Sequence, residues 1–158
     1  YNIAIGENAL RNNTTGERHV SVGRNALYTS VSAIENVAVG SDALYNNTIG
    51  GYNVAMGWEP LSENTTGQYN TAVGYQALKA NTTADGNVAV GYEALTSNTI
   101  GTLNSALGYQ ALKANTTGNY NTALGYNALF DNTIVFNPSP SYKHSNIYGF
   151  CVKLYVCC

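Results

Sequence analysis

The apolar positions of this chain recur every 17 residues. A glycine follows each small apolar triplet, and eight such glycines are evenly spaced without insertion or deletion. They are Gly6, Gly23, Gly40, Gly57, Gly74, Gly91, Gly108 and Gly125. The clearest copy spans residues 69–83, and we count positions within a unit from its first residue, so Tyr69 is position 1 and Gly74 is position 6. A fixed period of this kind is the sequence signature of a repeat protein.

Each unit predicts two short strands joined by turns. In the clearest copy the first strand is expected at residues 70–74 and the second at residues 76–79. Residues 81–83, with a following glycine or the variant at 84–86, form the return turn, because Asn and Gly tolerate positive φ. Helices are not expected, since β-branched residues and glycines recur and no apolar stripe has a 3.6-residue period.

A unit of this length cannot bury a face alone, so it must stack on its neighbours. We therefore predict an all-β fold, a parallel β-solenoid of eight 17-residue coils stacked about 4.8 Å apart. The repeat domain is expected to cover residues 1–136, and the repeat fails at Val135, where a glycine is due. Residues 137–158 have a different composition and form a separate tail.

Stacking places equivalent residues in rows along the solenoid. One row is predicted to fill the interior: Leu10, Leu27, Leu44, Leu61, Leu78, Leu95, Leu112 and Leu129. A row of small residues is broken only by Ser21: Ala4, Ala38, Ala55, Ala72, Ala89, Ala106 and Ala123. A third row is interrupted at Ser30: Asn13, Asn47, Asn64, Asn81, Asn98, Asn115 and Asn132. Stacked asparagines can pass amide hydrogen bonds from coil to coil and satisfy turn groups.

The first strand is apolar on both faces in every unit. Opposite the small residues stand Ile5, Val22, Val39, Met56, Val73, Val90, Leu107 and Leu124. A strand with one face in water should alternate apolar with polar residues, so this pattern predicts burial on both sides. A continuous apolar stripe indicates an interface, and a second copy of the chain is the expected partner. The alternative is a flattened solenoid whose interior takes up both faces.

Composition argues against several classes of function. Only 10% of the residues are charged, against about 25% in ordinary globular proteins, and the net charge is −2. This balance predicts no nucleic-acid partner and no field for cations. The 13 tyrosines, with abundant Asn and Thr, give a polar, uncharged surface suited to close packing or carbohydrate contact. No apolar run is long enough to span a membrane. We expect the natural chain to extend upstream of Tyr1.

The motifs at 36–40, 53–57 and 87–91, each Asn-Val-Ala-(Val or Met)-Gly, resemble the head repeats of trimeric autotransporter adhesins. The longer pattern at 118–129 is similar to repeats of phage and giant-virus fibre proteins and bacterial surface proteins. The resemblance covers residues 1–134. It implies a left-handed parallel β-roll packed as a trimer that binds host matrix or other surfaces. The 17-residue unit is longer than usual in those heads, and their neck, stalk and membrane anchor have no counterpart here, so outer-membrane attachment is not expected.

Candidate chemistry is confined to departures from the repeat. No catalytic residue, metal site or cofactor is predicted, because His19 has no companion at metal-ligand spacing and His144 lies in the tail. One aromatic row could offer ring faces to sugars, or could simply stack and stiffen the rod. It comprises Trp58, Tyr75, Tyr92, Tyr109 and Tyr126. The other departures, at Pro60 and Ser30, are too scattered for an active site.

Two further surface features follow from the turn. Sequons predict glycosylation at Asn12, Asn13, Asn46, Asn64, Asn81 and Asn115, or are simply ladder asparagines beside turn threonines. Threonines beside these asparagines raise ice binding as a minor alternative. They are Thr14, Thr48, Thr65, Thr82, Thr99, Thr116 and Thr133.

The tail contains all three cysteines, so the repeats have no disulfide framework. Its alternation of apolar residues predicts an edge strand that caps the solenoid or docks on a neighbour, unless this segment is not native sequence. Cys157 and Cys158 could cross-link chains in an oxidising setting, while the role of Cys151 stays open.

Taken together, the sequence predicts a structural segment of an extracellular fibre, cell-surface appendage or virion fibre. It would associate with itself as a homotrimer or as a head-to-tail filament. An adhesin-like module that binds surface glycans or host matrix is the alternative.

Overall fold

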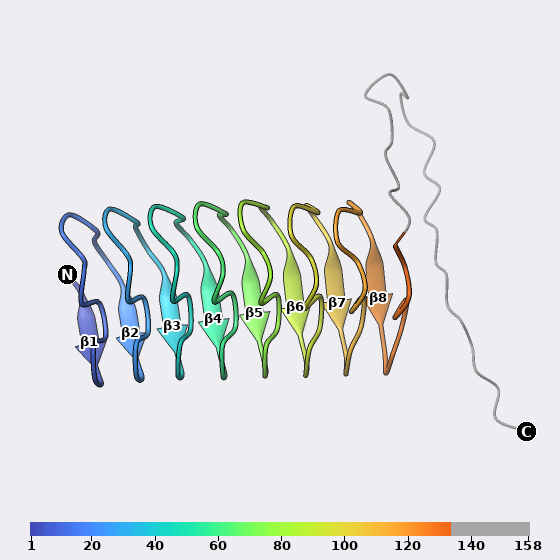
Figure 1. Cartoon of the computed structure of the whole chain (residues 1–158), viewed down its shortest axis with the longest axis horizontal. Coiled ribbons are helices and arrows are strands. Elements are labelled where there is room, and N and C mark those ends of the chain that lie inside the picture. The colour runs from blue at the N-terminus through green and yellow to red at the C-terminus, as the bar shows by residue number, and fades with distance from the viewer. Residues whose placement is uncertain (134–158) are drawn as a thin grey trace, which may run out of the picture.

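The computed structural model describes residues 1–133, which form a rod of stacked coils (Figure 1). Each unit contributes one strand: β1 (Ile3–Ile5), β2 (Val20–Val22), β3 (Val37–Val39), β4 (Val54–Met56), β5 (Thr71–Val73), β6 (Val88–Val90), β7 (Ser105–Leu107) and β8 (Thr122–Leu124). All eight lie in one parallel sheet in chain order. The predicted all-β parallel solenoid is therefore confirmed. The last residues of the predicted repeat domain, 134–136, and the tail, 137–158, lie outside the described residues.

The coils stack in strict 17-residue register. Ala38 pairs with Ala55 and Ala55 with Ala72, so each strand residue faces its equivalent in the next unit. Backbone hydrogen bonds between coils continue beyond the strands. Leu78 N donates to Ala94 O over 2.9 Å, and Thr65 N donates to Thr82 O over 2.8 Å. Turn segments are thereby held in the same ladder as the strands, as buried backbone groups require.

The second stretch of each unit is not a strand, so the prediction of a strand at residues 76–79 is wrong. These residues form a tight turn in which Gln76 has φ 50° and Leu78 has φ 54°. Left-handed backbone costs a residue with a Cβ about 1–2 kcal/mol, and leucine is not a residue type that signals it. The physical reason is closure: a 17-residue coil must bend sharply to return to its starting position, and one extended stretch already uses three residues.

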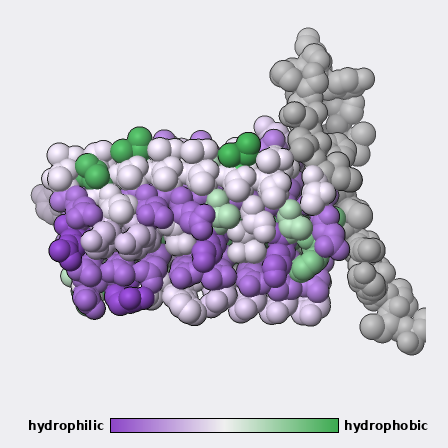
Figure 2. Space-filling view, viewed as in Figure 1, coloured by the Kyte–Doolittle hydropathy of each residue, from purple (hydrophilic) through white to green (hydrophobic). Residues whose placement is uncertain are grey.

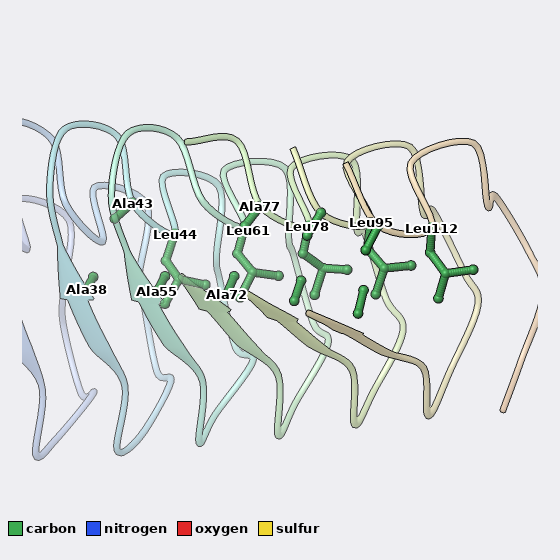
Figure 3. Packing of buried hydrophobic residues seen from close by; sticks show 14 of the residues in the cluster. Ala38, Ala43, Leu44, Ala55, Leu61, Ala72, Ala77, Leu78, Leu95 and Leu112 are labelled. Carbon is green, nitrogen blue, oxygen red and sulfur yellow. The ribbon is translucent and has the colours of Figure 1, made fainter. Parts of the chain in front are cut away.

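The core is a single column of leucines and alanines along the rod axis (Figure 3). Six of the eight predicted leucines are fully buried, and Leu10 and Leu129 at the ends are partly buried. The position-4 alanines from Ala38 to Ala123 are buried opposite them, whereas Ala4 in the first unit is exposed. Ser21, at the same position of the second unit, donates its hydroxyl hydrogen to Ala26 O over 2.8 Å. Burying one leucine contributes about 1.5–3 kcal/mol, so this column is the main apolar stabilisation of the rod.

The position-6 glycines mark where the strand ends and the coil turns. Gly74 has φ 133°, outside the range that L residues with side chains adopt readily. A Cβ on Gly74 would also collide with the carbonyl oxygen of Gly91 in the next coil. Close stacking and the backbone angle together explain why this position is glycine in all eight units.

Candidate interaction surface

The outward side of the sheet carries the side chains that flank the position-4 residue of each strand, which is buried in every strand except β1. We call the residues at positions 3 and 5 of the eight strands the sheet face. Its position-5 column is Ile5, Val22, Val39, Met56, Val73, Val90, Leu107 and Leu124. None of these eight is buried, and the exposed fraction reaches 59% for Ile5 and 74% for Leu124. Within residues 1–133, the stripe predicted as a self-association face lies on the outside of the solenoid and is uncovered.

The position-3 column changes along the rod. It is aliphatic in the first four strands, from Ile3 to Val54, and then includes Thr71, Ser105 and Thr122. In the last two strands, where position 3 is Ser105 or Thr122, position 5 is leucine. A shallow groove follows at β6–β8, lined by Val88, Val90, Ser105, Ala106, Leu107, Thr122, Ala123 and Leu124. Its surface is almost wholly apolar, so it suits another apolar side chain rather than a charged ligand.

Other surfaces of the rod are different in character. Figure 2 shows a face on which hydrophilic residues predominate and hydrophobic residues are isolated from one another. Isolated hydrophobic residues are normal on a protein surface, whereas a continuous column marks a binding site. The sheet face is therefore the candidate interface.

The predicted aromatic row is a stack. Ring centroids of Tyr75 and Tyr92 are 4.9 Å apart, those of Tyr92 and Tyr109 are 5.0 Å apart, and both pairs are nearly parallel. Tyr126 continues the stack at 5.2 Å, whereas Trp58 meets Tyr75 edge-on at 71°. The inner tyrosines therefore cover each other's faces and present mainly their edges to solvent. Ring faces that a sugar could contact therefore remain only at the ends of the row. Trp58, at one end, is 49% exposed.

Two shorter aromatic stacks were not predicted. Tyr28 lies 5.1 Å from Tyr45, and Tyr52 lies 5.0 Å from Tyr69, each pair nearly parallel. Their signal was available in the sequence, because each pair is separated by one repeat length. Nearly parallel, offset rings at this spacing stabilise a pair by about 0.5–1.5 kcal/mol beyond the area they bury. Tyrosines on different sides of the coil thus also tie neighbouring units together.

The predicted position-13 asparagine ladder is present from Asn47 to Asn115, whereas Asn13 is outside it and Asn132 Nδ2 donates to Asn121 Oδ1 instead. Asn64 Nδ2 donates to Asn47 Oδ1, and Asn81 Nδ2 donates to Asn64 Oδ1, each over 2.8 Å. The chain of bonds continues through Asn98 to Asn115. Each amide also donates to the position-16 carbonyl of its own coil, as Asn81 does to Ala84 O over 3.0 Å. The ladder closes the return turn and couples it to its neighbours.

A second buried asparagine ladder runs through position 2 and was not predicted as such. Asn53 N donates to Asn36 Oδ1 over 2.8 Å, and Asn53 Nδ2 donates to Gly67 O over 2.8 Å. These side chains join the start of a coil to its end. The sequence signal was the recurrence of Asn at position 2 in seven units, with His19 in its place in the other.

Burial divides the predicted glycosylation sites. Asn64, Asn81 and Asn115 are fully buried and their amides are used in the ladder, so the folded rod has no room for a glycan there. Asn13 is partly buried and its Nδ2 donates to Gly16 O over 3.0 Å. Asn12 and Asn46, one position earlier in the turn, are exposed. Their glycosylation stays a prediction.

The threonines proposed for ice binding have internal partners. Thr65 Oγ1 donates to Thr82 O, and Thr82 Oγ1 donates to Thr99 O, over 3.0 and 3.2 Å. Hydroxyls occupied in this way act as a side-chain ladder between coils. The same row does not present a set of free donors to solvent, which leaves the ice-binding hypothesis without structural support.

Charged residues form isolated pairs on the surface. Lys79 Nζ lies 2.7 Å from Glu59 Oε2, and Lys113 Nζ lies 2.6 Å from Glu93 Oε2. The hydrogen bond from Lys113 lowers the pKa of Glu93, and that from Lys79 lowers the pKa of Glu59. Each pair spans coils, so these charges help to hold neighbouring coils in register.

In the part of the chain that the structure describes, no three His, Cys, Asp or Glu side chains gather as metal ligands would. The same residues contain no helix of the length and hydropathy that a membrane crossing requires. No protein-family model, curated protein or solved structure matches the chain.

Proposed function

We propose that the chain is a structural segment of an extracellular or virion-surface fibre that associates with itself through the sheet face. The observation that carries this proposal is the position-5 column, which is apolar in every unit and exposed or partly exposed on all eight strands. A parallel sheet normally has both faces covered, and here the coil covers only one.

The physical drive for association is burial of this column. Removing apolar surface from water contributes about 25 cal/mol per Å², and a row of aliphatic side chains along a rod offers that surface continuously. A second copy of the chain has the same columns at the same axial spacing, so its side chains can interdigitate at every coil. A homotrimer is the expected assembly, and a head-to-tail filament is the other self-association considered.

The interior of the rod supports a mechanical role. The leucine column, two asparagine ladders and backbone bonds between coils repeat along the axis, so the described part is held uniformly. Nearest-neighbour stacking of this type gives a stiff, elongated body without a specialised pocket.

An adhesin-like module that binds glycans or host matrix is the second candidate. Trp58 favours it, because this indole lies edge-on to Tyr75 and is 49% exposed. Aromatic rings with free faces are suited to sugar contact. Since the inner tyrosines cover each other, such a site would centre on Trp58.

Met56 provides a direct test of the self-association proposal. It is the only methionine of the chain, it lies in the position-5 column, and it is 40% exposed. Its rate of oxidation by peroxide should fall as the protein concentration rises and the sheet face becomes covered. Acrylamide quenching of Trp58, the only tryptophan, serves as the control because that residue lies outside the sheet face. Equal oxidation rates across the concentration range would contradict the proposal.

A further inference from the structure

His19 is the only titratable side chain buried in the interior of the described rod. Its exposed fraction is 1%, and the other buried polar side chains of residues 1–133 are asparagines and serines. An asparagine amide does not gain a proton in the ordinary pH range, whereas histidine has an unperturbed pKa near 6.5. The second coil therefore differs from the others in a property that responds to pH.

The imidazole takes the place of an asparagine side chain in the position-2 ladder, and His19 is bonded to the coil before it and to the coil after it. Its own backbone N donates to Asn2 Oδ1 over 2.9 Å. Its Nδ1 accepts the hydrogen of Asn36 N over 3.2 Å, as the Oδ1 of Asn36 does in turn from Asn53 N. Nδ1 must be unprotonated to accept, so the hydrogen of the neutral ring is on Nε2.

The Nε2 side of the ring faces neutral groups. Nε2 is buried without a hydrogen-bond partner among the described residues. It lies beside Gly16. A Cβ added to Gly16 would collide with three atoms: Nε2 of His19, Ala33 O and Asn13 Oδ1. Ser30 replaces the ladder asparagine of this coil, which leaves Asn13 Oδ1 without a donor. In this coil a larger side chain at position 2, His19, is thus accompanied by a shorter side chain at position 13, Ser30.

No charged group compensates a proton on this ring. The ionisable residues beside it along the chain are Glu17 and Arg18. Glu35 occupies the position of Arg18 in the next coil. Their side chains are 61%, 56% and 37% exposed, and Arg18 pairs with Glu35. Tyr1, at the equivalent position of the first coil, is fully exposed. The groups that face the ring from the first three coils are backbone atoms and the amides of Asn2, Asn13 and Asn36.

Protonation would place an N–H of Nδ1 against the N–H of Asn36. Two buried donors would then face each other, and this hydrogen bond between the second and third coils would be lost. We propose that His19 makes the junction between the second and third coils an acid-sensitive joint of the rod. Above the joint's titration range the rod is continuous, and below it the first two coils separate from the remainder.

The direction of the effect follows from linkage. Burial lowers the pKa of His19 below 6.5, so the unfolded or opened segment binds a proton before the closed one does. The contribution of the neutral ring is therefore complete above pH 6.5 and declines as the pH falls below it. Between pH 6.5 and the lowered pKa of His19, the equilibrium constant for opening the joint should rise by up to about tenfold for each pH unit of acidification.

Hydrogen exchange of the full chain at pH 7.5 and at pH 5.0 tests the proposal, with rates corrected for intrinsic exchange. The matched variant is His19→Asn, which restores the residue found at position 2 in the other units and is expected to fold. In the wild type, protection of residues 3–37 should be lower at pH 5.0 than at pH 7.5, while that of residues 70–110 is retained. In His19→Asn the first segment should keep its protection.

Two outcomes would overturn the proposal. Equal loss of protection in the wild type and in His19→Asn would assign the effect to other groups. Loss spread evenly along residues 3–110 would assign it to the whole rod. As a second measurement, His144→Asn leaves His19 as the only imidazole of the chain for an NMR titration. A midpoint at or above 6.5 would also contradict the assignment.

Discussion

Asn81 donates its Nδ2 hydrogen to Oδ1 of Asn64 in the preceding coil over 2.8 Å, and both side chains are fully buried. The same Asn81 accepts from Asn98 Nδ2 over 3.3 Å and donates to Ala84 O over 3.0 Å. One amide therefore satisfies groups in three successive coils. Because neighbouring positions carry Ala80 and Thr82, a slip by one residue would leave these buried groups without partners.

We expect Asn81→Ala to lower the free energy of unfolding by about 2–4 kcal/mol, since each buried polar group left without a partner costs about 1–3 kcal/mol. Urea denaturation followed by circular dichroism measures this change. Asn46→Ala is the matched control, because Asn46 is exposed in the corresponding turn of another coil and should change stability little. Similar losses in the two variants would contradict the assigned role of the ladder.

Two glycines allow the cost of close stacking to be separated from the cost of backbone angle. At Gly74 a Cβ meets backbone atoms of the next coil and φ is 133°, so Gly74→Ala should destabilise the rod by about 3 kcal/mol or more. At Gly86 the φ of 69° is one that other residue types adopt at this position, and the Cβ meets only side-chain atoms of Leu103, with Cδ2 at 2.8 Å. Gly86→Ala should cost about 1 kcal/mol. Thermal unfolding of both variants provides the comparison.

The Glu93–Lys113 pair predicts a pH dependence of stability. The pKa of Glu93 in the folded chain is lowered, so the pair's contribution is present above the ordinary glutamate pKa and is lost as the pH falls through the lowered value. Lys113→Met should therefore be less stable than the wild type at pH 7, by less than about 1 kcal/mol, because the pair is partly exposed. Near pH 3 the two proteins should converge. An unchanged difference at pH 3 would contradict the assignment.

The tyrosine stack predicts a stability effect and separates the two functional candidates. Tyr92 stacks on Tyr75 and on Tyr109, so Tyr92→Ala should lose about 1–3 kcal/mol from two pairs. A glycan array probed with the wild type, Trp58→Ala and Tyr92→Ala then tests adhesion. Glycan binding that disappears with Trp58→Ala would favour the adhesin-like function, and absence of binding in all three proteins would favour a purely structural role.

Most of the fold could be predicted from the 17-residue repeat period. Leu78, Asn81 and Ala72 each recur at 17 residues, and stacking of equivalent residues then follows because identical units bury one another's edges. The interior position of Leu78 and the amide ladder of Asn81 could both be predicted on that basis. The outward direction of Val73 followed from strand alternation, since its neighbour Ala72 faces inward.

The turn at residues 76–79 could not be predicted because its cause is not local. Gln76 and Leu78 adopt positive φ although neither residue type favours it, and closure of the coil imposes that backbone. The position-2 ladder had a visible sequence signal in Asn53 and its equivalents. Its function required the coil geometry, which brings Asn53 beside Gly67 at the other end of the unit.

The molar mass of the chain in solution tests the central claim most directly. The chain mass is 16.8 kDa, and sedimentation equilibrium at micromolar concentration should give three times that value for the expected homotrimer. Larger, concentration-dependent masses would indicate the filament form of self-association. A charged substitution in the sheet face, Leu107→Lys, should lower the mass, whereas Ile100→Lys, an exposed aliphatic residue elsewhere, should not. A wild-type monomer at micromolar concentration would contradict self-association through the sheet face.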